Sequence, residues 1–210
     1  MSVKEFSREV SERVDPRVVR TRELIVRAFN ELVAEKGHTG LTVREIAGRA
    51  TINRATFYAH FADQYELFDY VVSEAFREEL RRRLPDPSGL GEEELRAMVL
   101  AACDYLASLN TACSRTDRQF KPLIEARVQA ELYELLLRWI EASPADGRSA
   151  DAEITATVVS WAIFGAGLRW SQGGEPGSVE EYADQALSAI AGGLGSQVVA
   201  RHTGRGDRGR

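Results

Sequence analysis

Residues 41–61 (LTVREIAGRATINRATFYAHF) contain the pattern that most restricts how this chain can fold. Apolar residues recur at helical spacing in two short runs that only a few residues separate. Thr42 stands at an N-cap position and Glu45 follows three residues later, so a capping box and a helix start are predicted here. Asn53 is placed to cap a second helix that ends at about Tyr58 or His60. Two helices joined so closely must cross steeply.

This arrangement is typical of a helix-turn-helix reader of DNA, in which the first turn of the second helix enters the major groove. It also occurs in helical proteins that do not bind DNA. Thr42 and Arg44, on the first turn of the preceding helix, are expected to flank the groove. Phe57 and Phe61 fall four residues apart on one face and are predicted to be core. The side chains expected to face base edges are Asn53, Arg54, Ala55 and Thr56.

The segment 17–67 resembles the DNA-binding domain of TetR-type (tetracycline-repressor-like, TetR/AcrR) bacterial transcriptional regulators. The resemblance rests on the runs TFYxHFxD at 56–63 and LTVRxIA at 41–47, and on the pair Glu66-Leu67. It implies that certain side chains contact DNA phosphates and that one arginine reads a base. The implied phosphate contacts are Tyr58, His60 and Thr42, and the implied base reader is Arg44.

Two residues depart from the family pattern. Thr51 stands in the turn where the family usually has glycine, which implies either a turn that tolerates a β-branched residue or some strain. Gln64 stands where the family usually has lysine at the start of the next helix. Its amide can still donate a hydrogen bond to a phosphate, but it lacks the charge. We therefore expect slightly weaker binding to the DNA backbone with the fold intact.

Charge is unevenly distributed along the chain. Residues 1–62 carry 11 Lys or Arg against 8 Asp or Glu, a net charge of +3, whereas residues 63–210 carry 16 against 24, a net charge of −8. The positive part is the part predicted to meet phosphates. Arg49 is interpreted as a solvated charge rather than a phosphate contact. An arginine cluster that could follow the DNA backbone comprises Arg17, Arg20, Arg22 and Arg27, while Arg13 is assigned to a solvated tail.

Helical periodicity runs through the chain and no segment shows sustained strand alternation, so the predicted fold class is all-α. The first helix is expected to end at Gly37. Further helices are predicted at 63–83, 92–109, 121–142, 150–172 and 178–195, with a short helical piece near 115–119. The predicted domains are a three-helix DNA-binding domain at 1–62, a helical ligand-binding and dimerisation domain at 63–200 with 63–83 as connecting helix, and a disordered tail at 201–210.

The body of the chain contains two candidate sites beyond the DNA-binding segment. The resemblance implies a dimer interface on the last two long helices, and the candidate residues are Ala162, Gly165, Ala166 and Arg169. It also favours a cavity for a small-molecule effector, although a stripe at helical spacing is more often ordinary core. The candidate lining is Met98, Tyr105, Phe120, Ile124, Val128, Leu132, Leu135, Trp139 and Phe164. Tyr105, Asp104 and Arg127 are candidate polar handles, and Arg127 is alternatively a surface ion-pair partner.

Other classes of function are less compatible with the sequence. The three histidines are widely spread, and no nucleophile elbow, phosphate loop or metal-ligand spacing occurs, so we expect no enzyme, cofactor or metal. Cys103 and Cys113 are interpreted as buried free thiols. No run is long enough to cross a bilayer and no signal peptide is evident, so a cytoplasmic protein is expected.

The function predicted from the resemblance is a homodimeric repressor that binds a palindromic DNA operator and releases it when a hydrophobic or amphipathic effector binds the body. Two alternatives remain. One is a helical protein-interaction module, which leaves Tyr58, His60 and the segregated positive charge unexplained. The other is a transcriptional activator of the same fold, because the sign of regulation depends on where the operator lies.

Overall fold

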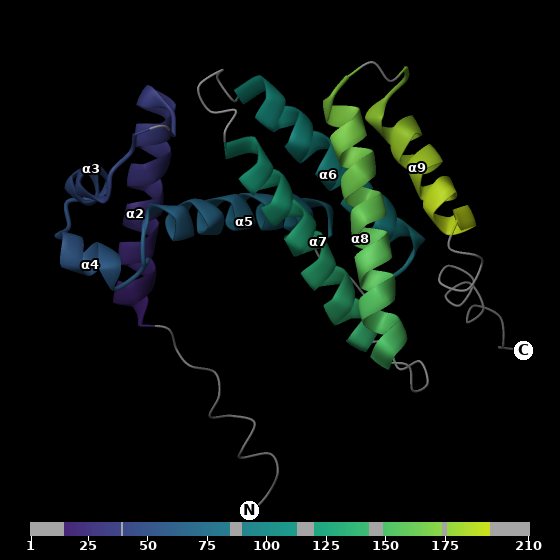
Figure 1. The fold of residues 1–210 in the computed structure, drawn as a ribbon, viewed down its shortest axis with the longest axis horizontal. Helices are drawn as coiled ribbons and strands as arrows, with labels where there is room; N and C mark the ends of the chain where they lie inside the picture. The colour runs from purple at the N-terminus through teal and green to yellow at the C-terminus, as the bar shows by residue number, and fades with distance from the viewer. Residues whose placement is uncertain are drawn as a thin grey trace, which may run out of the picture. The chain divides into compact units, whose positions relative to one another are not determined.

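A computed structural model describes residues 15–38, 40–84, 90–112, 120–142, 149–173 and 176–193 (Figure 1). Across these residues every regular element is a helix, which confirms the predicted all-α class. None of the described helices is long and apolar enough to span a membrane. The helices are α2 (Pro16–Lys36), α3 (Val43–Arg49), α4 (Arg54–Tyr58), α5 (Gln64–Arg83), α6 (Glu92–Ala112), α7 (Lys121–Ala142), α8 (Ser149–Ser171) and α9 (Val179–Gly193).

The chain divides into two compact units, Met1–Phe68 and Asp69–Arg210, each of which is described separately. The first unit contains α2, α3, α4 and the first residues of α5. Helix α2 starts with Asp15 as N-cap, whose side chain accepts a hydrogen bond from the Arg17 amide, and it ends at Gly37 in a positive-φ conformation, as the sequence predicts. The buried side chains of this unit are Ile25, Ala28, Phe29, Leu32, Leu41, Ile46, Ala47, Ala50, Phe57, Phe61, Leu67 and Phe68.

The aromatic core of the first unit contains Phe57 and Phe61, whose ring centroids lie 5.9 Å apart. Both side chains are buried, which confirms that they are core rather than DNA contacts. His38 also packs here, with its ring 5.1 Å from Phe68 and 5.7 Å from Phe29. Aromatic contacts of this kind add to the area that the rings bury, and those of His38 connect α2 to the start of α5.

The second unit is a helical bundle in which α8 packs against both α6 and α7, and α9 packs against α6 (Figure 1). Gly167 allows a close approach between α6 and α8, because a Cβ at this position would lie 2.8 Å from the Ala102 Cβ. A glycine inside a helix costs about 1 kcal/mol relative to alanine, so close packing is the reason for this one. Gly165 is exposed, and a Cβ there would meet no atom within 4 Å.

The helices of the body have nearly the bounds that the periodicity predicts. Helix α7 has the predicted range of 121–142, while α6 extends three residues further than expected and α9 lies within the predicted 178–195. The short helical piece near 115–119, the tail at 201–210, Arg13 and Cys113 lie outside the described residues. Cys103 is a buried free thiol, as predicted, and burial together with the neighbouring charge of Asp104 raises its pKa to about 12.

Candidate nucleic-acid interface

The first turn of α3 is held by the capping box that the sequence predicts. The Glu45 amide donates to Thr42 Oγ1 at 3.3 Å, and the Thr42 amide donates to Glu45 Oε2 at 3.0 Å. Lys36 contacts the same carboxylate, and hydrogen bonds from Lys36 and then from Thr42 lower the pKa of Glu45 to about 2. Arg44, directly after this box, is exposed. The local caps therefore direct the first turn of α3, with Arg44, toward solvent.

The turn between α3 and α4 is a Schellman motif with Thr51 in the left-handed region at φ 58°. The Ile52 amide donates to the Ala47 carbonyl at 2.9 Å, and the Thr51 amide donates to the Gly48 carbonyl at 3.2 Å. A β-branched residue is unfavourable at positive φ. The position thus requires the conformation that glycine adopts freely, and of the two alternatives derived from the sequence the structure favours strain.

Helix α4 begins at the predicted cap. Asn53 Oδ1 accepts hydrogen bonds from the Thr56 amide at 2.7 Å and from the Thr56 hydroxyl at 3.1 Å. Phe57 is buried while Tyr58 is 55% exposed, so the helix presents one polar side to solvent. We call the exposed side chains at the start of α3 and along α4, together with the two N-caps, the recognition face. Its members are Thr42, Arg44, Asn53, Arg54, Ala55 and Tyr58.

Three further predicted DNA contacts are half-buried: Thr56, His60 and Gln64. The His60 carbonyl accepts a hydrogen bond from Arg22 at 3.3 Å, and the Arg22 guanidinium lies 5.0 Å from the centre of the Phe61 ring. Burial, followed by the charge of Arg22, lowers the pKa of His60, so the imidazole is neutral near pH 7. Arg22 therefore packs within this unit. Its contacts are structural, although the sequence places it in the arginine cluster expected to follow the DNA backbone.

Arg49 is exposed, which agrees with a solvated charge, and it is also held in ion pairs. Its guanidinium donates two hydrogen bonds of 2.7 Å to the two carboxylate oxygens of Glu35, and it lies 3.4 Å from Glu31. The contact with Glu35 is the main cause that raises the pKa of Arg49, and the contact with Glu31 adds to it. The bidentate pair ties the end of α3 to α2. The sequence did not indicate this pair, because Glu35 lies 14 residues away and its approach depends on the tertiary fold.

Most of the predicted effector-lining side chains point into the core of the second unit. Four of them are half-buried: Tyr105, Phe120, Leu135 and Trp139. Of all the predicted lining residues, only Tyr105 lines the hollow between α5 and α6 that is described below. The members buried in the core are Met98, Ile124, Val128, Leu132 and Phe164. Their positions agree with the alternative of ordinary core as well as with a lining, so the assignment stays a prediction.

A hollow of about 480 Å³ lies between α5 and α6. It contains two of the predicted polar handles, Tyr105 and Asp104, but its surroundings are charged rather than apolar. Arg83 contacts both Glu79 and Asp104 across it. The remaining lining residues are Ala75, Arg82 and Ser108. Its charges neutralise one another, so the hollow differs from the apolar cavity expected from the sequence.

The predicted dimer residues lie on α8. Gly165 and Arg169 are exposed, and Ala162 and Ala166 are half-buried. The same helix exposes three large apolar side chains at helical spacing that the sequence-based list omitted, and the last of them, Trp161, packs against Phe164 at 5.8 Å. These side chains are Ile154 (65% exposed), Val158 (45%) and Trp161 (57%).

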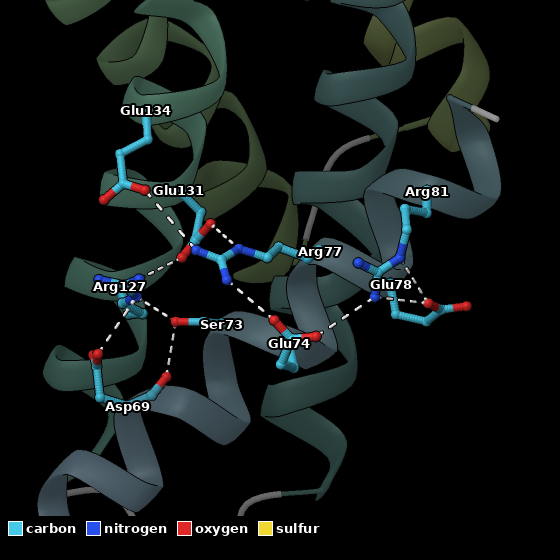
Figure 2. A network of polar contacts seen from close by, with 9 residues as sticks. All are labelled: Asp69, Ser73, Glu74, Arg77, Glu78, Arg81, Arg127, Glu131 and Glu134. Carbon is cyan, nitrogen blue, oxygen red and sulfur yellow. Dashed lines mark hydrogen bonds and ion pairs between the residues drawn. The ribbon is translucent and has the colours of Figure 1, made fainter. Parts of the chain in front are cut away.

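A group of polar and charged side chains, ranging from buried to exposed, joins α5 to α7 (Figure 2). We call it the charge cluster, and its central members are Asp69, Ser73, Arg77, Arg127 and Glu131. Arg127 is thus an ion-pair partner, as one of the two alternatives proposed. The sequence offers one signal for the cluster: Arg127 and Glu131 stand four residues apart within an otherwise apolar stripe. The polar handles predicted from the sequence include Arg127 but not its partner Glu131. Across the described residues, no group of three or more His, Cys, Asp or Glu is arranged to hold a metal ion.

Comparison with known proteins identifies the first unit. Residues 25–71 match the family model for bacterial regulatory proteins of the tetR family. The chain is 40% identical over 72 residues to the uncharacterized HTH-type transcriptional regulator YxbF of Bacillus subtilis (strain 168), and 46% identical over 54 residues to an uncharacterized HTH-type transcriptional regulator of Haemophilus influenzae (strain ATCC 51907 / DSM 11121 / KW20 / Rd). These alignments cover 34% and 26% of this chain, and 19% and 26% of those proteins.

The fold of most of the chain has a counterpart among solved structures. A TetR-family regulator from Streptomyces coelicolor A3 aligns with a TM-score of 0.54 at 17% identity, covering 83% of this chain and 94% of that one. The chain thus has an N-terminal helix-turn-helix domain followed by a larger helical domain, as predicted. Residues 25–71 therefore form a TetR-type domain, which confirms the resemblance drawn for this segment of the sequence. That family consists of regulatory proteins rather than enzymes.

Proposed function

We propose that this chain is a cytoplasmic, homodimeric transcriptional repressor that binds a palindromic DNA operator and releases it when a small hydrophobic or amphipathic effector binds. The observation that carries the proposal is the recognition face, on which caps hold Arg44 and Arg54 in exposed first turns within a TetR-type domain. Recognition helices place their first residues against base edges in the major groove.

The recognition face suggests a division of labour among its side chains. Arg44 and Arg54 can donate two parallel hydrogen bonds to the major-groove edge of a guanine, which is the commonest specific contact. Tyr58 and Thr42 have hydroxyl groups suited to phosphate oxygens. Asn53 and Thr56 bond to each other at the cap, so their first role is to orient the helix. Gln64 adds a neutral donor where a lysine would add charge.

A dimer is required because the two halves of a palindrome lie about 34 Å apart and each needs its own reading head. The exposed apolar stripe Ile154, Val158 and Trp161 on α8 supports self-association. Contiguous apolar patches on a protein surface mark interaction sites, and a two-fold axis would pair the stripe with its own copy. The exposed Gly165 permits close approach on the same side of α8.

The effector would bind in the second unit, where apolar side chains of α6, α7 and α8 converge. Its class follows from this lining, because apolar pockets with few polar groups select hydrophobic or amphipathic molecules. Repression would end when the effector favours a conformation whose reading heads do not match successive major grooves. A coupling of about 1–3 kcal/mol between the two ligands suffices for such a response.

The first test is fluorescence anisotropy of the purified chain with duplexes tiled across the DNA upstream of its gene, at several salt concentrations and against a scrambled duplex. Sequence-specific binding with a steep salt slope and two chains per site is expected. If the operator lies elsewhere, selection from a randomised library of DNA duplexes identifies its sequence. If the selection enriches no sequence, the regulator proposal is wrong and a protein-interaction module becomes the better hypothesis.

A pair of variants locates the contact surface. Arg44→Ala combined with Tyr58→Ala should weaken operator binding by about 10- to 100-fold, since a base contact is worth about 1–3 kcal/mol. Arg138→Ala is the matched control, because this exposed arginine lies on α7 in the second unit, outside the recognition face and the arginine cluster. Equal loss in both variants would contradict the assignment of the recognition face. Circular dichroism establishes that each variant is folded.

A further inference from the structure

The charge cluster joins α5 and α7 at two successive turns of each helix (Figure 2). At the first, Arg127 donates to the Ser73 hydroxyl and lies 3.6 Å from the Asp69 carboxylate. At the second, Arg77 Nε donates to Glu131 Oε2 at 2.7 Å. Glu131 Oε1 accepts from Arg127 at 2.5 Å, so one carboxylate links both turns.

Burial makes this arrangement costly. Glu131 and Ser73 are each only 2% exposed. Burial is the largest single influence on Arg77 and opposes its charge, yet the hydrogen bonds and charges of Glu131 and Glu74 together outweigh burial, so the pKa of Arg77 is raised. Buried ion pairs can often be replaced by apolar residues of similar size without loss of stability. Stability alone is therefore a poor explanation for why charges occupy this interface.

The directionality of the cluster offers a better explanation. The apolar side of α5, formed by Val72, Phe76 and Leu80, packs without strong directional preference, and Phe76 lies 5.2 Å from the Tyr105 ring of α6. The hydrogen bonds of the cluster form in one register only. Advancing α5 by one turn would bring Arg77 to the place of Ser73, where its guanidinium would face that of Arg127. Like charges in a partly buried site repel strongly.

We propose that the charge cluster sets the register of α5 on α7 and thereby sets the operator affinity of the protein. Helix α5 is continuous from Gln64 to Arg83, and its first residues belong to the DNA-binding unit, so a displacement along α7 is carried into that unit. The inference rests on the proposed function. It assigns the regulatory element to a set of charges within the second unit, apart from the apolar lining.

The test replaces the central pair by apolar residues in the full-length protein, as Arg77→Met with Glu131→Leu. Arg127 keeps Asp69 and Ser73 as partners. The matched control is Arg96→Met with Asp184→Asn, which removes an ion pair between α6 and α9 in the same unit. Three quantities are measured for each protein: thermal midpoint, operator affinity, and amide hydrogen exchange of the peptides covering 69–83.

We expect the central variant to keep its thermal midpoint, to lose at least fivefold in operator affinity, and to exchange the amides of α5 faster, whereas the control matches wild type in all three. Ser73→Ala, a milder change that removes one acceptor for Arg127, should shift operator affinity in the same direction by about three- to fivefold. It provides the same test if the double variant does not fold.

Two results would overturn the inference. Operator affinity within twofold of wild type in a folded central variant would mean that the cluster does not set it. A loss of affinity accompanied by a lower thermal midpoint would mean that the cluster only stabilises the unit. If wild type itself binds no selected duplex, the proposed function fails instead, and unchanged exchange of α5 in the central variant would then reject the register role as well.

Discussion

The recognition face and the charge cluster are both polar, but they are built in opposite ways. The recognition face is exposed and is organised by contacts between residues three positions apart, such as Thr42 with Glu45 and Asn53 with Thr56. The charge cluster is partly buried and joins residues 54 positions apart, Arg77 to Glu131 and Arg127 to Ser73. A surface that must meet DNA leaves its charges available, whereas a helix interface must pair every charge that it removes from water.

This difference predicts the largest stability effect at Glu131. Glu131→Ala leaves Arg77 and Arg127 without their shared carboxylate and should lower the free energy of unfolding of the second unit by about 3 kcal/mol. All three tryptophans, at 139, 161 and 170, lie in this unit, so urea unfolding followed by tryptophan fluorescence reports on it. Glu134→Ala is the control, because this half-exposed carboxylate is 3.9 Å from Arg77. Equal effects of the two changes would show that burial does not distinguish them.

The cap of α3 should produce a smaller effect, confined to the first unit. Thr42→Ala removes the acceptor for the Glu45 amide and should cost about 1 kcal/mol. Amide hydrogen exchange of peptides covering 40–50 measures the loss. Thr21→Ala, which removes a hydroxyl bonded to the Arg17 carbonyl within α2, is the control and should change little. Unchanged protection in Thr42→Ala would mean that the capping box does not hold α3.

The turn between the recognition helices should respond with the opposite sign. Thr51→Gly relieves the strain of a β-branched residue at φ 58°, but it also loosens the unfolded chain, so a net gain below about 1 kcal/mol is expected. Thr51→Ala retains a Cβ and should not share the gain. Amide hydrogen exchange compares the two variants. If the glycine variant is less protected than the alanine variant, Thr51 is not strained in the wild-type protein.

The smallest effect concerns pH. The pKa of His60 lies below its ordinary value of 6.5, so the free protein holds this imidazole neutral at pH 7. A phosphate beside it would favour the protonated form, so operator binding takes up a proton and tightens by a few fold as pH falls from 7.5 to 5.5. Anisotropy at constant ionic strength measures the slope. His60→Gln should flatten it, and an unchanged slope would remove His60 from the phosphate contacts.

The features of this protein that involve residues close together in the sequence could be predicted from the sequence alone. Caps at Thr42 and Asn53, the stop at Gly37 and the aromatic pair Phe57 and Phe61 all involve neighbours within four residues, and the structure contains each of them. The all-α class follows from the same local periodicity. The family resemblance added roles for individual side chains that periodicity does not supply, and those roles stay predictions.

The tertiary structure decided how the charges are used. Arg49 was assigned to solvent, although its partner Glu35 lies on another helix, and Gly167 owes its place to Ala102 on α6. Glu131 was missed because nothing in its local sequence shows that Ser73 and Arg77 would approach it. An apolar stripe specifies that a helix is buried, but the partner that a charge meets depends on how distant segments pack, and only the folded chain determines that.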